Sequence, residues 1–217
     1  MHSKKTLPLT HNYRPSNLEG KAPAIIMLHG YGSNEDDLFS FAGELPEKYA
    51  IIALKAPLSP QGMGNAWYSI YFENNNSAKF NDTEQAIEAR ELVVKTIDSA
   101  IEKYNLDKDN ITLLGFSQGT ILSLAVALSY PEKVKRIVAL SGYLADDMLV
   151  EGYKEKDYSH LSIFQSHGTQ DMVIPVQWAK NAHESLKTLK IDTIYKEYPV
   201  GHGVSPQNFY DFRKWLD

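Results

Sequence analysis

The sequence predicts an α/β protein with a mostly parallel, twisted sheet and helices on both of its faces. Short runs that are apolar at every position and rich in β-branched residues recur along the chain, as in strands buried on both faces. Stretches with a helical apolar period lie between them, which is the alternation of a doubly wound sheet. Ligands of such sheets bind beyond the carboxyl ends of the strands, so the turns that follow strands are the places to search for a site.

The expected strands are short apolar segments. They cover residues 24–28, 51–54, 111–114, 137–140 and 163–165. Residues 193–198 form a sixth expected strand, and their alternation of polar and apolar side chains indicates a position nearer the edge of the sheet.

Helical periodicity is clearest in residues 82–104, where apolar side chains recur every three or four positions. Asp82, followed three residues later by Gln85, is typical of a helix N-terminus. Residues 118–130 are apolar nearly all round, which indicates a buried helix, and Pro131 ends it. Further helices are expected over residues 34–45, over residues 176–189 and from Ser205-Pro206 towards Leu216.

Length, composition and charge exclude several classes of protein. The 217 residues suit one α/β domain, so residues 1–217 are expected to form a single domain. A formal net charge of −5 without charge blocks argues against nucleic-acid binding and against an anionic membrane surface as the main partner. Cysteine is absent, which excludes disulfides, thiol nucleophiles and cysteine-ligated zinc. Without a visible signal peptide or a bilayer-spanning run, we expect a cytoplasmic protein with no stable membrane anchor.

The turn after residues 111–114 carries the strongest chemical signal. It reads Gly115-Phe116-Ser117-Gln118-Gly119, a Gly-x-Ser-x-Gly pattern between a buried strand and a buried helix. Glycines two positions before and after leave room for a tight turn that lifts the serine hydroxyl above the sheet. The N-terminus of the following helix places backbone N–H groups where an oxyanion would develop. Ser117 is therefore the expected nucleophile.

A nucleophilic serine needs a base oriented by an acid, and in this architecture the acid and then the histidine follow the serine. His202 lies between two glycines directly after the last expected strand, and we expect it to be the base. His183 lies inside a helix, where a packing or surface role is favoured. Asp171 follows the strand at residues 163–165 and is the expected acid, while His167 precedes it and is interpreted as structural. Three acids in an irregular charged stretch are expected to be solvated: Asp146, Asp147 and Asp157.

The turn after the first expected strand reads Leu28-His29-Gly30-Tyr31-Gly32-Ser33. A His-Gly turn at this place is typical of one that gives an N–H to an oxyanion hole, the second N–H coming from the residue after the nucleophile. The expected donors are the backbone amides of Tyr31 and Gln118, with His29 as scaffolding. The acids at residues 35–37 suit the first turn of a helix. No spaced set of histidines and carboxylates indicates a metal site, and no cofactor is expected.

Together these segments resemble the phospholipase/carboxylesterase family of α/β-hydrolases, which includes the acyl-protein thioesterases. The matching motifs are Leu28-His29-Gly30-Tyr31-Gly32, Gly115-Phe116-Ser117-Gln118-Gly119, Ser141-Gly142, His167-Gly168-Thr169-Gln170-Asp171 with Val173 and Pro175, and Gly201-His202. They keep the order of the family along most of the chain. The resemblance implies an α/β-hydrolase fold without a large lid domain, a catalytic triad of Ser117, Asp171 and His202, and oxyanion amides at Tyr31 and Gln118.

The expected activity is that of a carboxylesterase that cleaves short to medium acyl esters through an acyl-enzyme. The partner would be a small-molecule ester or an acyl thioester. Hydrolysis of acylated proteins or lysophospholipids on the same triad is the alternative. A third interpretation is a catalytically silent binding module, which would be expected to have lost a triad residue. The sequence leaves the physiological substrate and the oligomeric state open, a homodimer included.

Apolar residues in otherwise polar loops are expected to bind the acyl chain. They are Trp67, Tyr68, Tyr143, Leu144, Met172 and Val173. Because no insertion is long enough to form a large lid, they predict an open groove and not a tunnel. Ser69 stands where many relatives carry an aspartate two positions after the tryptophan, which leaves the contribution of that aspartate to substrate shape open.

Overall fold

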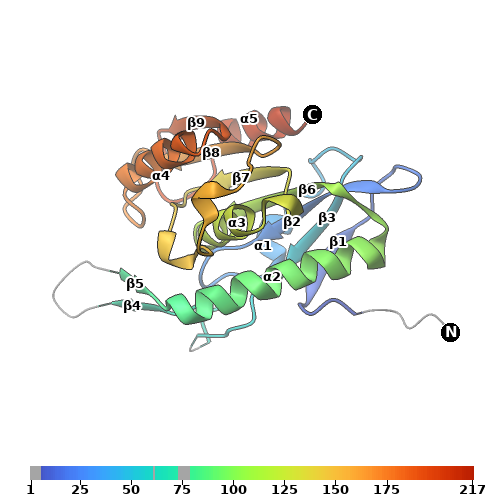
Figure 1. The fold of residues 1–217 in the computed structure, drawn as a ribbon, viewed down its shortest axis with the longest axis horizontal. Helices are drawn as coiled ribbons and strands as arrows, with labels where there is room; N and C mark the ends of the chain where they lie inside the picture. The colour runs from blue at the N-terminus through green and yellow to red at the C-terminus, as the bar shows by residue number, and fades with distance from the viewer. Residues whose placement is uncertain (1–5, 61, 73–78) are drawn as a thin grey trace.

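The computed structural model describes residues 6–60, 62–72 and 79–217, and a seven-stranded sheet forms its centre (Figure 1). The strand order is β1-β3-β2-β6-β7-β8-β9. The strands are β1 (His11–Arg14), β2 (Ala22–Leu28), β3 (Ala50–Leu54), β6 (Leu106–Phe116), β7 (Arg136–Leu140), β8 (Ser162–Gly168) and β9 (Asp192–Tyr198). Only β1 pairs antiparallel with its neighbour, so the predicted mostly parallel α/β sheet is confirmed.

In the described residues four α-helices lie between strands, and a fifth follows β9. They are α1 (Glu35–Phe39), α2 (Thr83–Tyr104), α3 (Gln118–Ser129), α4 (Val176–Thr188) and α5 (Pro206–Leu216), with short 3-10 helices at Pro131–Lys133, Asp146–Met148 and Tyr153–Glu155. Asp82 caps α2 by accepting the N–H of Gln85, as its spacing predicts. The helix expected over residues 34–45 ends earlier, at Phe39. The Ser40 hydroxyl donates to the Asp37 carbonyl there, and such a local bond competes with helix continuation.

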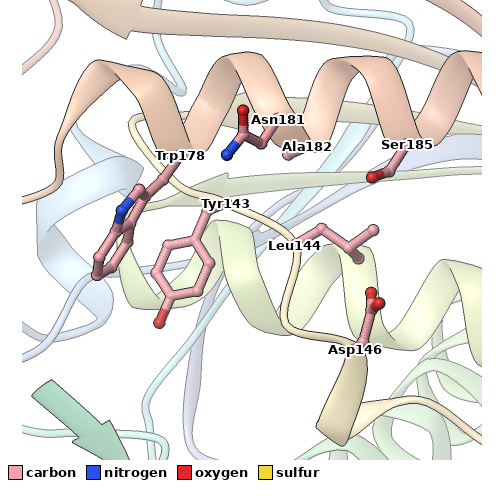
Figure 2. Close-up of a pocket in the computed structure, with 7 residues that line it drawn as sticks. All are labelled: Tyr143, Leu144, Asp146, Trp178, Asn181, Ala182 and Ser185. Atoms are coloured by element: carbon pink, nitrogen blue, oxygen red, sulfur yellow. The ribbon is translucent and has the colours of Figure 1, made fainter.

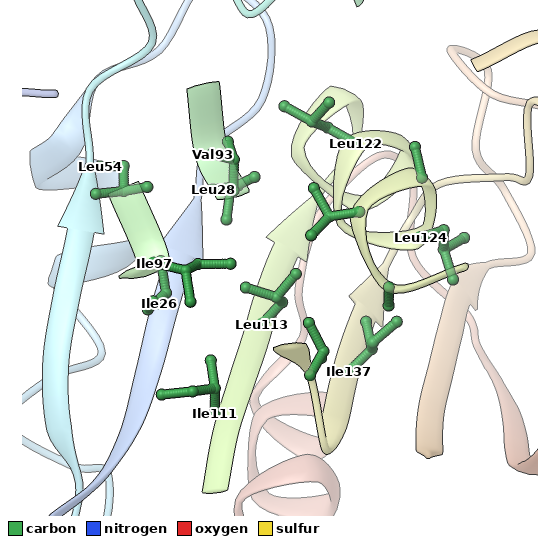
Figure 3. Close-up of a cluster of buried hydrophobic side chains, with 14 of the residues drawn as sticks. Ile26, Leu28, Leu54, Val93, Ile97, Ile111, Leu113, Leu122, Leu124 and Ile137 are labelled. Carbon is green, nitrogen blue, oxygen red and sulfur yellow. The ribbon is translucent and has the colours of Figure 1, made fainter. Parts of the chain in front are cut away.

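The apolar core lies in two layers, one on each face of the sheet. Neighbouring residues of β2 point to opposite faces: Ile26 belongs to the cluster that includes residues of α2, α3 and α4, whereas Ile25 belongs to the one that includes residues of α1 and α5. Figure 3 shows Ile26 beside Ile97 of α2 in the first of these layers. Burial of both strand faces is the reason that the central strands are apolar at every position.

Three strands were not expected from the sequence. β1 has a polar sequence, His-Asn-Tyr-Arg, and lies at one edge of the sheet, where it pairs with β3 alone. β4 (Ile70–Phe72) and β5 (Lys79–Asn81) form a separate antiparallel hairpin, which projects beyond the N-terminal end of α2 (Figure 1). β9 lies at the other edge of the sheet, as its alternation predicts. No helix within the described ranges is long and apolar enough to cross a bilayer.

Candidate active site

Ser117 lies at the junction of β6 and α3 in a backbone conformation that side-chain-bearing residues rarely adopt. Its φ is 54° and its ψ is −117°. The Ser117 N–H donates to the carbonyl of Leu140 at the end of β7, and its own carbonyl accepts from Thr120 in the first turn of α3. A Cβ at Gly115 would overlap the backbone of Gly119, and one at Gly119 would overlap the Leu28 carbonyl. Both glycines are therefore required by close backbone approach, as the motif predicts.

The structure brings Ser117, His202 and Asp171 into one hydrogen-bonded chain. Nε2 of His202 lies 2.9 Å from the Ser117 hydroxyl, and Nδ1 of His202 lies 2.7 Å from Oδ2 of Asp171. Asp171 lies in the loop that follows β8, and His202 lies between β9 and α5. Because a carboxylate only accepts, Nδ1 carries the proton of this bond and Nε2 is left to accept the serine proton.

The carboxyl group of Asp171 is wholly buried and surrounded by N–H donors. Its Oδ1 accepts the backbone N–H groups of Val173 at 2.8 Å and of Ile174 at 2.9 Å. Burial raises the pKa of Asp171, but the hydrogen bonds from His202 and from the two amides outweigh burial and hold that pKa below its ordinary value. Asp171 is therefore ionised at neutral pH and able to stabilise a positively charged imidazole.

His167 has a contact that the sequence interpretation missed. Its Nε2 lies 3.2 Å from Oδ2 of Asp171 and 2.9 Å from the Ile174 carbonyl, and its ring is fully buried. Both neighbours are acceptors, so Nε2 carries the proton. The four-residue spacing of His167 and Asp171 was the signal in the sequence for this contact. The loop between them has no helical or strand pattern that would indicate where its side chains point. His183, by contrast, stacks on Tyr195 away from this chain of contacts.

The turn after β2 runs beside Ser117. Leu28 pairs with Gly115 in the register of β2 and β6, so the two strands end side by side. An added Cβ at Gly30 would lie 3.4 Å from Cβ of Ser117. Within the described residues, neither the N–H of Tyr31 nor that of Gln118 donates to a loop or turn carbonyl. Both amides therefore keep a free N–H for a bound acceptor.

His29 is fixed inside this turn as a scaffold. Its Nδ1 lies 2.7 Å from the Gly30 carbonyl, and its Nε2 accepts the N–H of Ala56 at 3.1 Å. Burial lowers the pKa of His29, which agrees with an Nε2 atom that accepts. His29 therefore holds backbone in place and has no free nitrogen for proton transfer.

Trp67 and Tyr68 differ from their expected place on an open groove. They are 1% and 0% exposed, and Trp67 borders a separate pocket with Pro57, Leu58 and Leu92. The indole N–H of Trp67 donates to the carbonyl of His29 at 2.9 Å, and such an interior partner is what allows a tryptophan to be buried. The sequence could not show this, because the partner lies in a segment far along the chain.

Tyr143 and Leu144 do line a groove, of about 380 Å³, between the loop after β7 and helix α4 (Figure 2). The remaining lining residues are Asp146, Trp178, Asn181, Ala182 and Ser185. The Tyr143 ring meets the Trp178 ring edge to face, with 5.0 Å between their centroids. An added Cβ at Gly142, the residue before Tyr143, would lie 3.1 Å from the Ser117 carbonyl. Trp178 and Asn181 were not identified from the sequence; the amphipathic pattern of α4 was the available signal.

Met172 and Val173 lie on the loop beside Asp171 and do not line this groove. They are 94% and 45% exposed. The acids at residues 35–37 form the first turn of α1, as expected. In the described part of the chain, no group of three or more histidine and carboxylate residues has the arrangement of a metal site.

The chain is similar to known proteins over nearly its whole length. The model of the phospholipase/carboxylesterase family matches residues 16–217. An acyl-protein thioesterase 1 from Candida albicans is 28% identical over 218 residues, which cover 93% of this chain and 94% of that protein. A carboxylesterase from Arabidopsis thaliana is 25% identical over 202 residues, 88% of each chain.

A solved structure shows the same fold. The carboxylesterase of Bacillus cereus superposes with a TM-score of 0.80 at 20% identity, over 96% of this chain and 93% of that one. The α/β-hydrolase fold is therefore shared between the two proteins. The family model matches nearly the whole chain, and the shared fold agrees with it. The chain belongs to the phospholipase/carboxylesterase family of ester hydrolases.

Proposed function

We propose that this protein is a serine carboxylesterase that cleaves esters of short to medium acyl chains. The observation that carries the proposal is the hydrogen-bonded chain from Asp171 through His202 to the Ser117 hydroxyl. The free amides of Tyr31 and Gln118 on the adjoining turns support it. A serine, a histidine and a buried carboxylate in this order are the parts that acyl transfer requires.

The proposed reaction has two halves. Ser117 Oγ attacks the ester carbonyl while Nε2 of His202 takes the hydroxyl proton, and Asp171 stabilises the resulting imidazolium. The amides of Tyr31 and Gln118 donate to the oxyanion of the tetrahedral intermediate. His202 then protonates the leaving alcohol, and the acyl group stays on Ser117. Water, deprotonated by His202, attacks this acyl-enzyme and releases the carboxylic acid.

The acyl chain would occupy the groove that begins at Tyr143 (Figure 2). The aromatic edge of Tyr143 and Trp178 and the side chain of Leu144 supply apolar surface close to the elbow. Thioester cleavage is the second candidate, and relatives such as the acyl-protein thioesterase 1 of Candida albicans favour it. The same steps would apply, with a thiol as the leaving group.

Two measurements test the proposal. A fluorophosphonate probe should label the wild-type protein and the surface variant Ser99→Ala, but not Ser117→Ala, because the Ser117 hydroxyl is hydrogen-bonded to a histidine and that of Ser99 to a backbone carbonyl. Turnover of p-nitrophenyl esters should fall by roughly 10⁴-fold or more in Ser117→Ala. A matched series of acyl thioesters then decides between the two substrate classes. Labelling or full turnover in Ser117→Ala would show that another residue is the nucleophile.

A further inference from the structure

Two buried side chains beside the elbow have no part in the proposed steps: the indole of Trp67 and the side-chain amide of Gln118. The indole N–H of Trp67 donates to the His29 carbonyl at 2.9 Å. The backbone N–H of Trp67 donates to Oε1 of Gln118, also at 2.9 Å. Nε2 of Gln118 donates to the Tyr68 carbonyl at 2.8 Å. The segment at residues 67–68 is thus bonded to both the turn after β2 and the elbow after β6.

Each of these two turns carries one amide of the proposed oxyanion hole. The N–H of Tyr31 shares its peptide group with the Gly30 carbonyl, which accepts from His29 Nδ1 at 2.7 Å. The preceding carbonyl, that of His29, is the acceptor of the Trp67 indole. The ring of His29 also lies against that indole, with 5.5 Å between ring centroids. Trp67 therefore holds the peptide group that precedes the one with the N–H of Tyr31, and it packs on the His29 ring that holds the latter.

On the elbow side, the N–H of Gln118 shares its peptide group with the Ser117 carbonyl. That carbonyl accepts from Thr120 and Ile121, so helix α3 fixes the peptide group between Ser117 and Gln118. The two hydrogen bonds of the Gln118 side chain fix this side chain against the backbone of residues 67–68. Since Gln118 is 2% exposed, water does not compete for either bond.

We propose that Trp67, bonded to Gln118, is a positioning residue that sets the separation of the two oxyanion amides. The inference rests on the proposed function and adds a determinant of transition-state binding to it. Oxyanion donors act only within about 2.7–3.1 Å of the developing charge, so a small shift of one turn against the other weakens them. Trp67 touches no acyl chain, and its effect on rate is therefore independent of chain length.

The test compares Trp67→Phe, Gln118→Met and the double variant. Trp67→Phe keeps an aromatic ring but removes the indole N–H, and Gln118→Met removes two of the three hydrogen bonds. We expect kcat/KM to fall roughly tenfold in each single variant, equally for acetyl, butyryl and hexanoyl p-nitrophenyl esters. The inhibition constant of an alkyl boronic acid, which forms a tetrahedral adduct on serine, should rise by the same factor. The double variant should lose less than the product of the two single losses, because both act on one unit.

Trp215→Phe is the matched control, since Trp215 packs on Phe164 on the other face of the sheet. Its kcat/KM should stay within about twofold of wild type. A lower melting temperature with unchanged kcat/KM in Trp67→Phe would overturn the inference, and so would a loss that grows with acyl length. If Trp67→Phe does not fold, Gln118→Met carries the same comparison. A wild-type protein that neither turns over esters nor takes the fluorophosphonate would instead overturn the proposed function.

Discussion

Nε2 of His167 lies 3.2 Å from the Oδ2 atom of Asp171, with both side chains fully buried. That carboxylate oxygen accepts from His202, and the other oxygen accepts two backbone N–H groups. Three N–H groups therefore donate to the carboxylate, and Nε2 of His167, whose hydrogen bond goes to the Ile174 carbonyl, lies beside it. A loop aspartate that must keep one orientation gains this order only from such neighbours.

Replacing His167 tests this contact. His167→Phe keeps a ring of similar size but removes the N–H that donates to the Ile174 carbonyl and lies beside Asp171. We expect kcat/KM to fall roughly tenfold, since a buried carbonyl left without a donor costs about 1–3 kcal/mol and the loop that positions Asp171 shifts to relieve it. His167→Gln, which keeps an N–H, should recover part of this loss, and a kcat/KM of His167→Phe equal to that of the wild type would exclude the role.

The buried His29 makes stability depend on pH. Burial lowers the pKa of His29 in the folded state, whereas the unfolded chain binds a proton below its ordinary pKa of about 6.5. Its contribution to stability is therefore present above about pH 6.5 and is lost as the pH falls toward the folded-state pKa. Urea unfolding at pH 7, 6 and 5 should show a steeper loss in wild type than in His29→Gln. His183, whose pKa burial also lowers, is common to both proteins and cancels; equal slopes would contradict the prediction.

Two glycine-to-alanine substitutions test whether close backbone contact at the elbow, and not the substitution itself, determines the loss of stability. A Cβ at Gly119 would overlap the Leu28 carbonyl, whereas one at Gly43 meets nothing within 4 Å. Gly119→Ala should lower the free energy of unfolding by about 3 kcal/mol or more, because the turns after β2 and β6 must move apart. Gly43→Ala should stay within about 1 kcal/mol. Similar unfolding free energies for the two variants would show that the contact at the elbow is relaxed easily.

The groove at Tyr143 predicts a preference for longer acyl chains. Each buried methylene contributes up to about 0.8 kcal/mol, so kcat/KM should rise from acetyl to roughly butyryl or hexanoyl esters. Leu144→Ala removes part of the groove lining and should flatten that rise while leaving acetyl turnover nearly unchanged. Leu18→Ala, at an exposed position outside the groove, is the control. Acetyl esters as the best substrates, with the same profile in Leu144→Ala, would place the acyl chain elsewhere.

The sequence by itself determined the order of the central strands and helices along the chain. Strands buried on both faces are apolar at every position, and the long helix α2 keeps a 3.6-residue stripe, so both are visible in one dimension. The elbow was also visible in the sequence, because both of its glycines lie two residues from Ser117. Gly115 is required by its contact with Gly119, and Gly119 by its contact with the end of β2. Asp171 and His202 could be chosen because strand ends meet at one edge of a parallel sheet.

Only the tertiary structure decided how the loop side chains are used. Trp67 faces inward because its indole N–H finds the His29 carbonyl, 38 residues away in the chain. His167 reaches Asp171 because an aperiodic loop folds back, and α4 completes the groove because β8 lies next to β7. A loop has no repeating pattern of burial, so the direction of each side chain depends on which distant partner satisfies its polar atoms. That choice is made only when the elements pack together.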